Sequence, residues 1–286
     1  MRPIRTIAVL PTMFTLGNLV CGFFAIVVAA RVVAPGTLAV DPQDTWNVMY
    51  SGWLIVIAML FDALDGYVAR LSRTASEFGK QLDSLCDVVT FGVAPGFLLV
   101  KMCPRFALFH KEAVWVIAAS YAACAALRLA RFNVAATYNL GTGARNFTGF
   151  PIPAAAGLIS SLTLLVLSNS NYQNEAEINA GFGGIGLAAL MVFLALMMFS
   201  KFEYPSFKGF NWRTQFSLPK FLGVVLLLWL NIIYYWWMPA VMFVSYLLYG
   251  FLRPFISRAW RREIEEDGED EPPAAQPVAP PPPEDV

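Results

Sequence analysis

Long uncharged runs alternate with short polar segments along most of this chain of 286 residues. A helix needs about 20 mostly apolar residues to cross the hydrocarbon core of a membrane. By that measure the pattern predicts eight spans, near residues 8–32, 48–72, 85–103, 113–134, 151–169, 182–200, 218–236 and 238–254. The last two are divided at Trp236, Trp237 and Pro239, which combine interfacial aromatic rings with a helix breaker. The sequence therefore predicts an all-α membrane protein, a polytopic helical bundle of about eight transmembrane helices.

Composition and charge support a membrane location. The chain is 57% hydrophobic and only 14% charged, whereas soluble domains carry roughly 25% charged residues. Its formal net charge is zero, so it lacks the basic surface that nucleic-acid binding requires. Most of the 20 Lys and Arg residues fall in segments that eight spans would place on the same side as both termini. The positive-inside rule then predicts that both termini are cytoplasmic.

The C-terminal segment differs in kind from the rest of the chain. An acidic run begins at Glu263, and the proline-rich stretch Pro280–Pro283 follows it. Such a segment cannot bury enough apolar surface to offset the entropy lost on ordering. We predict a transmembrane domain over residues 1–257 and a disordered cytoplasmic tail over residues 258–286.

Acidic residues are rare in and beside the predicted spans, and four of them, Asp62, Asp65, Asp83 and Asp87, lie at the end of the second span and the start of the third. A carboxylate inside a membrane helix costs roughly 2.5–3.5 kcal/mol on insertion scales. Asp62, Asp65 and Gly66 share one stripe of a helix, and Asp83 and Asp87 share a stripe of the next. Because the connection between these helices is short, we expect them to be antiparallel neighbours whose carboxylate pairs face each other.

Four adjacent carboxylates repel one another unless cations lie between them. Ligation by oxygen alone favours hard ions such as Mg²⁺ or Mn²⁺, and two such ions can bridge a phosphate. A buried ion network with Arg70, Arg73 and Lys80 is one alternative, and a proton or cation pathway is another. The position of the acids near the membrane edge, rather than at mid-bilayer, favours a reaction on a lipid head group over transport.

The spacing D-x2-D-G-x2-A-R-x8-G-x3-D-x3-D, from Asp62 to Asp87, resembles the signature of the CDP-alcohol phosphatidyltransferase family at every motif position. Segments 11–22, 83–95, 128–133 and 147–153 are similar to the phosphatidylserine synthase branch of that family, although Thr12 stands where many relatives carry Asn. The resemblance implies transfer of the phosphatidyl group from CDP-diacylglycerol to L-serine, with release of CMP. It also implies a homodimer.

The resemblance implies roles for individual residues. The metal ligands, for two Mg²⁺ or Mn²⁺ ions, would be Asp62, Asp65, Asp83 and Asp87. Asp87 would also act as the general base on the serine hydroxyl. The residues in contact with CDP-diacylglycerol would be Thr12, Thr15, Gly66, Arg70 and Ser76. The residues that bind the acceptor would be Arg128, Arg131 and Asn133.

Two features near the proposed acceptor residues have simpler explanations. A serine carboxylate suits a guanidinium partner, but arginines at the cytoplasmic end of a span also follow from the positive-inside rule alone. The stretch Gly149–Pro153 predicts a turn at the start of a helix rather than a ligand contact.

Two rival functions stay open from the sequence. An enzyme with the same chemistry and another acceptor, such as glycerol phosphate, inositol phosphate or choline, would differ only in its acceptor pocket. An ion-coupled transporter would use the acids as a pathway and would release no CMP.

Overall fold

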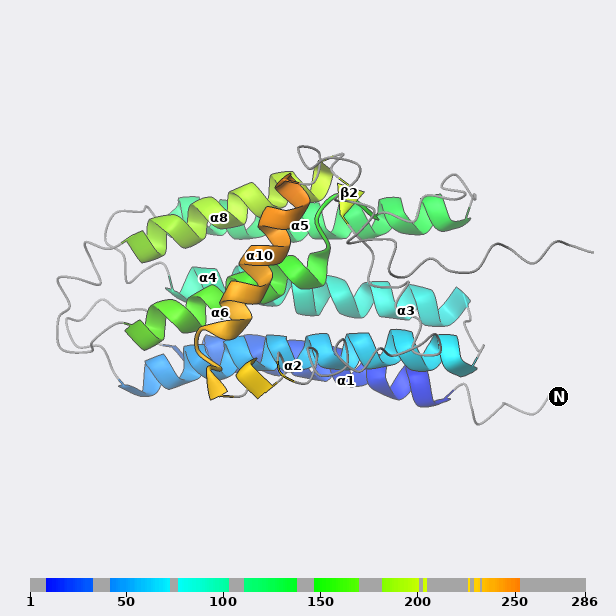
Figure 1. The fold of residues 1–286 in the computed structure, drawn as a ribbon, viewed down its shortest axis with the longest axis horizontal. Coiled ribbons are helices and arrows are strands. Elements are labelled where there is room, and N and C mark those ends of the chain that lie inside the picture. Colours follow the sequence, from blue (N-terminus) through cyan, green and yellow to red (C-terminus); the bar gives the residue numbers. More distant parts are fainter. Residues whose placement is uncertain are drawn as a thin grey trace, which may run out of the picture.

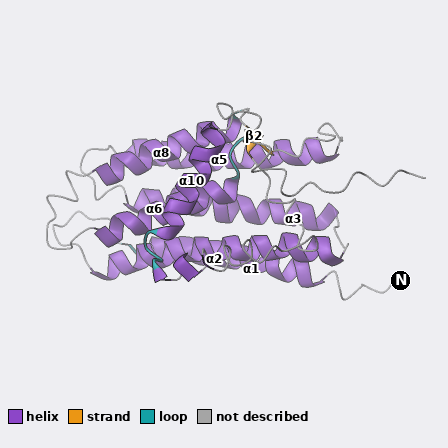
Figure 2. Cartoon of the chain, viewed as in Figure 1, coloured by secondary structure: helices purple, strands orange, loops and turns teal. Residues whose placement is uncertain are grey.

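The computed structural model describes residues 9–32, 42–72, 77–102, 111–137, 147–169, 182–200, 203–204, 226, 229–231 and 233–252. Its helices are α1 (Val9–Ala30), α2 (Pro42–Ser72), α3 (Glu77–Asp87), the π-helix η2 (Val88–Val93), α4 (Ala94–Met102), α5 (Lys111–Thr137), α6 (Ile152–Asn169), α8 (Phe182–Phe199) and α10 (Met238–Leu252). Two short strands, β1 (Phe147–Thr148) and β2 (Glu203–Tyr204), accompany them. Figure 1 shows their arrangement, and Figure 2 shows that helix dominates the described chain. The predicted all-α class is confirmed.

Several of these helices are long and apolar enough to cross a membrane. Within the described ranges, four meet both criteria, over Thr12–Ala30, Gln43–Val68, Glu77–Met102 and Glu112–Val134. Shorter apolar helices cover Ile152–Leu167, Gly186–Phe199 and Met238–Leu252. Together they identify a multi-pass membrane protein. Most of the predicted span 218–236, and the whole of the predicted tail 258–286, lie outside the described residues, so the total of eight spans stays a prediction.

Two helices begin more than one turn earlier than the hydropathy pattern predicted. The second begins at Pro42 rather than at residue 48, and the third begins at Glu77 rather than at residue 85. Proline is well tolerated in the first turn of a helix, and an acidic residue there interacts favourably with the helix dipole. Hydropathy marks only the apolar portion of a helix, whereas backbone hydrogen bonding continues through its polar end. As a result, Asp83 lies well inside a helix that runs on through η2 and α4.

Helix α1 packs against both segments that carry the four aspartates. It runs antiparallel to α2, because Thr15 of α1 hydrogen-bonds to Asp65 of α2 while Gly17, further along α1, lies against Phe61. It runs parallel to the α3–α4 segment, because α1 meets that segment at Asp87 near one end and through Lys101 near the other. In Figure 1, α1 and α2 lie side by side, and α10 crosses the neighbouring helices obliquely.

The apolar core lies where α2, η2, α4, α5, α6 and α8 meet. Its largest fully buried side chains include Phe91, Leu98, Tyr121 and Ile159. The Tyr121 hydroxyl donates a hydrogen bond of 3.2 Å to the Phe91 carbonyl, so a polar group of the π-helix is satisfied inside the core. Many large apolar side chains elsewhere are exposed, as expected for helices whose outer faces contact lipid.

A tight turn links the strand pair to α6. The strands pair antiparallel, with Phe147 opposite Tyr204. Gly149 then adopts a φ of +83°, and the Phe150 N–H donates to the Met197 carbonyl at 3.1 Å. Helix α6 begins directly afterwards at Ile152, so the predicted turn at a helix start is confirmed.

Candidate active site and metal centre

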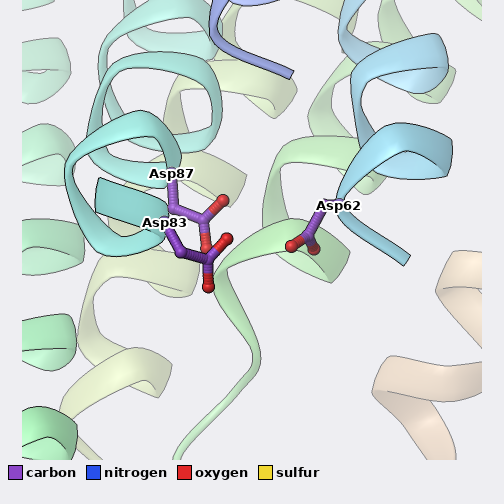
Figure 3. A group of neighbouring side chains, drawn as sticks. All are labelled: Asp62, Asp83 and Asp87. Carbon is purple, nitrogen blue, oxygen red and sulfur yellow. The ribbon is translucent and has the colours of Figure 1, made fainter. Parts of the chain in front are cut away.

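Three of the four predicted aspartates come together between α2 and α3. Asp62 projects from α2, and Asp83 and Asp87 project from successive turns of α3 toward it (Figure 3). One carboxylate oxygen from each lies within 4.8 Å of the others. Asp87 is buried, with 7% of its surface exposed, whereas Asp62 and Asp83 are half-buried. The cluster is therefore partly exposed at Asp62 and Asp83 and buried at Asp87.

The cluster has the chemistry and the size of a site for a small divalent ion. Every donor is a carboxylate oxygen, which suits hard cations. Oxygens on opposite sides of one Mg²⁺ ion lie about 4.2 Å apart, since each Mg–O bond is about 2.1 Å. The observed spread of 4.8 Å exceeds this by so little that small side-chain rotations close it. Mutual repulsion of three carboxylates at this range also favours a bound cation.

Asp65, the fourth predicted ligand, is engaged differently. Its carboxylate accepts a hydrogen bond from the Thr15 hydroxyl of α1, and 7% of its surface is exposed. It is not a member of the three-carboxylate cluster. The same bond occupies Thr15, which the resemblance assigned to CDP-diacylglycerol. A metal role for Asp65 and a substrate role for Thr15 stay predictions.

Helix α1 contributes one further polar contact that the sequence analysis did not assign. The Nδ2 atom of Asn18 donates to Oδ1 of Asp87 at 3.0 Å, and Asn18 is fully buried. Thr15 and Asn18 are three residues apart in a mainly apolar helix and therefore share a face. That pair of polar residues was the available signal, because a membrane helix rarely buries polar side chains without partners.

Of the three basic residues in the alternative ion network, Lys80 has a described side chain. Lys80 pairs with Glu77, its neighbour on α3, at 3.0 Å, and both side chains are largely exposed. The side chain of Arg70, together with Arg73 and Ser76, lies outside the described part of the chain. Lys80 thus interacts away from the aspartate cluster.

The remaining residues predicted to bind CDP-diacylglycerol lie along the same two helices. Gly66 is exposed on α2, one turn beyond Asp62, and a Cβ added there would meet no described atom within 4 Å. Thr12 is half-buried on α1. The open space at Gly66 would accommodate a substrate close to the helix backbone.

The three predicted acceptor residues on α5 differ in their surroundings. The Nη2 atom of Arg128 donates to the Gly149 carbonyl at 3.3 Å, which ties α5 to the turn before α6. Asn133 donates to the Ser84 hydroxyl at 2.9 Å, beside Asp83 on α3. Arg131 is exposed. Of the three, Asn133 is thus held next to the aspartate cluster by a direct hydrogen bond.

Comparison with known proteins gives a consistent result. The family model for CDP-alcohol phosphatidyltransferases matches residues 8–212. A CDP-diacylglycerol–serine O-phosphatidyltransferase of Helicobacter pylori is 30% identical over 258 residues, which cover 88% of this chain and 93% of that protein. A protein of the same name from Methanocaldococcus jannaschii is 34% identical over 172 residues, covering 60% of this chain and 72% of that protein. An archaetidylserine synthase of Methanothermobacter thermautotrophicus is 37% identical over 163 residues, covering 56% of this chain and 60% of that protein.

Proposed function

Because the chain belongs to the CDP-alcohol phosphatidyltransferase family, we propose that it transfers the phosphatidyl group of CDP-diacylglycerol to L-serine. Two of the relatives described above are named for this reaction, and the third is named for a serine lipid. The observation that carries the proposal is the cluster of Asp62, Asp83 and Asp87 between two membrane helices. Such a cluster suits a reaction at a pyrophosphate that is attached to a membrane lipid.

The reaction breaks a phosphoanhydride bond in CDP-diacylglycerol and forms a phosphoester bond to serine. The serine hydroxyl oxygen attacks the phosphorus that carries the diacylglycerol, and the bond from that phosphorus to the bridging pyrophosphate oxygen breaks. CMP leaves with the electrons of that bond, and the serine hydroxyl loses its proton. The products are phosphatidylserine and CMP. The protein must therefore compensate negative charge on the pyrophosphate and accept one proton.

The aspartates divide these tasks. Asp62, Asp83 and Asp87 would hold one or two Mg²⁺ or Mn²⁺ ions, and the resemblance adds Asp65 as a fourth ligand. When bound, such an ion would neutralise charge on the phosphate oxygens and on departing CMP. Asp87 would take the proton from the serine hydroxyl. Its burial supports this role, because exclusion of water from the base limits side reactions such as hydrolysis of the lipid substrate.

Substrate recognition follows from the surfaces next to the cluster. The open space beside Gly66 supports a place for the CDP portion along α2, together with Thr12, Thr15, Arg70 and Ser76 as the resemblance implies. The three α5 residues would surround the acceptor, and the exposed guanidinium of Arg131 is suited to the serine carboxylate. Asn133, which bonds to Ser84, would contribute by shaping the α3–α5 junction.

The cellular arrangement is part of the proposal. The distribution of basic residues supports an inner or cytoplasmic membrane location with both termini and the active site facing the cytoplasm. The homodimer implied by the resemblance stays a prediction.

The decisive experiment supplies the purified protein, in detergent micelles, with CDP-diacylglycerol and one acceptor at a time. We expect CMP and phosphatidylserine with L-serine, loss of both with EDTA, and recovery with Mg²⁺ or Mn²⁺. Glycerol 3-phosphate, inositol phosphate and choline should give little product. Transfer to one of these acceptors and none to serine would refute the proposed substrate, and activity that survives complete metal removal would refute the proposed metal site.

Variants of the aspartates provide the matched comparison. Asp62→Asn and Asp83→Asn each remove one negative charge from the cluster and should abolish CMP release. Asp44→Asn removes a carboxylate of the same kind from the first turn of α2, at the opposite end of that helix, and should retain activity. Equal activity in all three variants would contradict the assignment of the site.

A further inference from the structure

Asn18 is a fully buried amide in an apolar helix, and one carboxylate is its side-chain partner. Its Nδ2 atom donates to Oδ1 of Asp87 at 3.0 Å. An ionised carboxylate can only accept hydrogen bonds, so the amide must present its NH₂ group to Asp87. The opposite amide orientation would set two acceptors against each other. The contact is therefore directional and chemically unambiguous.

Packing alone does not account for an asparagine at this position. The Oδ1 atom of Asn18 is buried and has no hydrogen-bond partner among the described residues. A buried acceptor without a partner destabilises a protein, and leucine, which has the same number of side-chain heavy atoms and the same branching at Cγ, would place no polar atom there. The hydrogen bond to Asp87 therefore explains why an asparagine occupies this position.

The backbone that carries Asn18 is held close to the segment that follows Asp87. The Thr90 hydroxyl in η2 donates to the Asn18 carbonyl at 3.2 Å. One turn further along α1, Gly22 lies so close to Thr90 that a Cβ at Gly22 would collide with the threonine side chain. The π-helix that contains Thr90 begins at Val88, directly after Asp87. Helix α1 is thus positioned against this segment independently of the Asn18 side chain.

We propose that Asn18 is a positioning residue for Asp87. The Asn18 amide holds the Oδ1 atom of Asp87. This contact restricts rotation of the Asp87 carboxylate and directs its Oδ2 atom toward Asp62 and Asp83. A carboxylate fixed in this way reaches metal and serine hydroxyl in one orientation rather than several. Groups that orient a metal-binding residue typically affect metal affinity or activity about 10- to 100-fold. The inference rests on the proposed function for its catalytic part, but its metal-binding part stands apart from the choice of acceptor.

The test compares two hydrogen bonds between the same two segments. Asn18→Leu removes the bond to Asp87, whereas Thr90→Val removes the bond to the Asn18 backbone and leaves the Asp87 contact in place. Three quantities are measured on the full-length purified protein: Mn²⁺ affinity by electron paramagnetic resonance, kcat and KM in the transferase assay, and the thermal midpoint Tm. Asn18→Ser is the milder second variant, which applies if the leucine variant does not fold.

Asn18→Leu should weaken Mn²⁺ binding and lower kcat, each about 10- to 100-fold, while KM for CDP-diacylglycerol changes less than about twofold. Asn18→Ser should fall between it and the wild type. Thr90→Val should lower Tm and leave Mn²⁺ affinity and kcat within about twofold of the wild type. A purely structural role predicts the same losses in the leucine and valine variants, and that result, or unchanged Mn²⁺ affinity and kcat in Asn18→Leu, would overturn the proposal.

The outcome for Asn18 is separable from the outcome for the proposed function. If the wild type uses an acceptor other than serine, the proposed substrate is wrong, and the same comparison of variants is made with that acceptor. If none of the acceptors supports CMP release by the wild type, the Mn²⁺ titrations alone decide whether Asn18 orients Asp87.

Discussion

Substitution of Gly22 by alanine tests whether the close approach of α1 to η2 sets the geometry of the site. A Cβ at Gly22 would lie 2.7 Å from the Thr90 Cβ atom and 2.8 Å from its Cα atom, whereas ordinary contacts begin at 3.4 Å. Because one of these atoms belongs to the backbone, rotation of the Thr90 side chain cannot relieve the collision. Helix α1 must therefore move away from η2 by about 0.6–0.7 Å, since a packed interior offers no free volume to absorb the overlap.

A movement of that size is enough to break the contact between Asn18 and Asp87. The hydrogen bond would lengthen from 3.0 Å to about 3.6–3.7 Å, which exceeds the range of a hydrogen bond. Overpacking of this kind costs about 1–3 kcal/mol, and the higher helix propensity of alanine offsets at most about 1 kcal/mol of it. We expect Gly22→Ala to lower kcat at least tenfold and to reduce Tm.

The assay is CMP release from CDP-diacylglycerol, measured together with thermal unfolding of the purified protein. Gly52→Ala is the matched control, because a Cβ at Gly52 would lie 3.4 Å from the nearest side-chain atom, in ordinary contact with Leu164. This control should leave kcat and Tm close to those of the wild type. A fully active Gly22→Ala enzyme with an unchanged Tm would refute the reasoning, since α1 would then tolerate displacement without effect on Asp87.

Three further predictions concern other parts of the site. Gly66→Ala should raise KM for CDP-diacylglycerol without lowering Tm, because the new methyl group enters space that the described residues leave open; a lower Tm with an unchanged KM would contradict this. Gly149→Ala should reduce stability by at least about 1–2 kcal/mol in thermal or denaturant unfolding, because Gly149 has a φ of +83° and a Cβ there would collide with the Met198 carbonyl. Asn133→Ala and Ser84→Ala should cause similar losses of activity that do not add in the double variant, because each removes the same hydrogen bond. Additive losses would mean that Asn133 acts on the acceptor directly.

The fold class followed from hydropathy because lipid imposes a simple rule: a chain that crosses the bilayer as a helix needs a long apolar run. Helix bounds were less predictable. The helices that begin at Pro42 and Glu77 extend through polar residues. Hydropathy excludes these polar residues from the helix, whereas backbone hydrogen bonding includes them.

The sequence predicted which aspartates form the candidate site better than it predicted the hydrogen-bond partner of each one. Helical periodicity placed Asp83 and Asp87 on one face of a helix and Asp62 on the facing helix, and the structure brings these three together. The prediction of facing pairs treated Asp65 as equivalent to Asp62, whereas the structure joins Asp65 to Thr15. Periodicity within one helix cannot reveal a partner on a third helix, because that contact depends on how the helices pack.

The sequence by itself determined that apolar helices cross a membrane and that four carboxylates fall on two helical stripes, because both properties depend only on residue type and on the helical repeat. The tertiary structure alone decided which carboxylates share a cluster and which bond to α1. That choice depends on differences of a few tenths of an ångström in the distance between helices. These distances follow from side-chain volumes, and Gly22, which has no Cβ, allows a close approach. Hydrogen bonding tolerates little error in distance, so Asn18 reaches Asp87 only once α1 is packed in place.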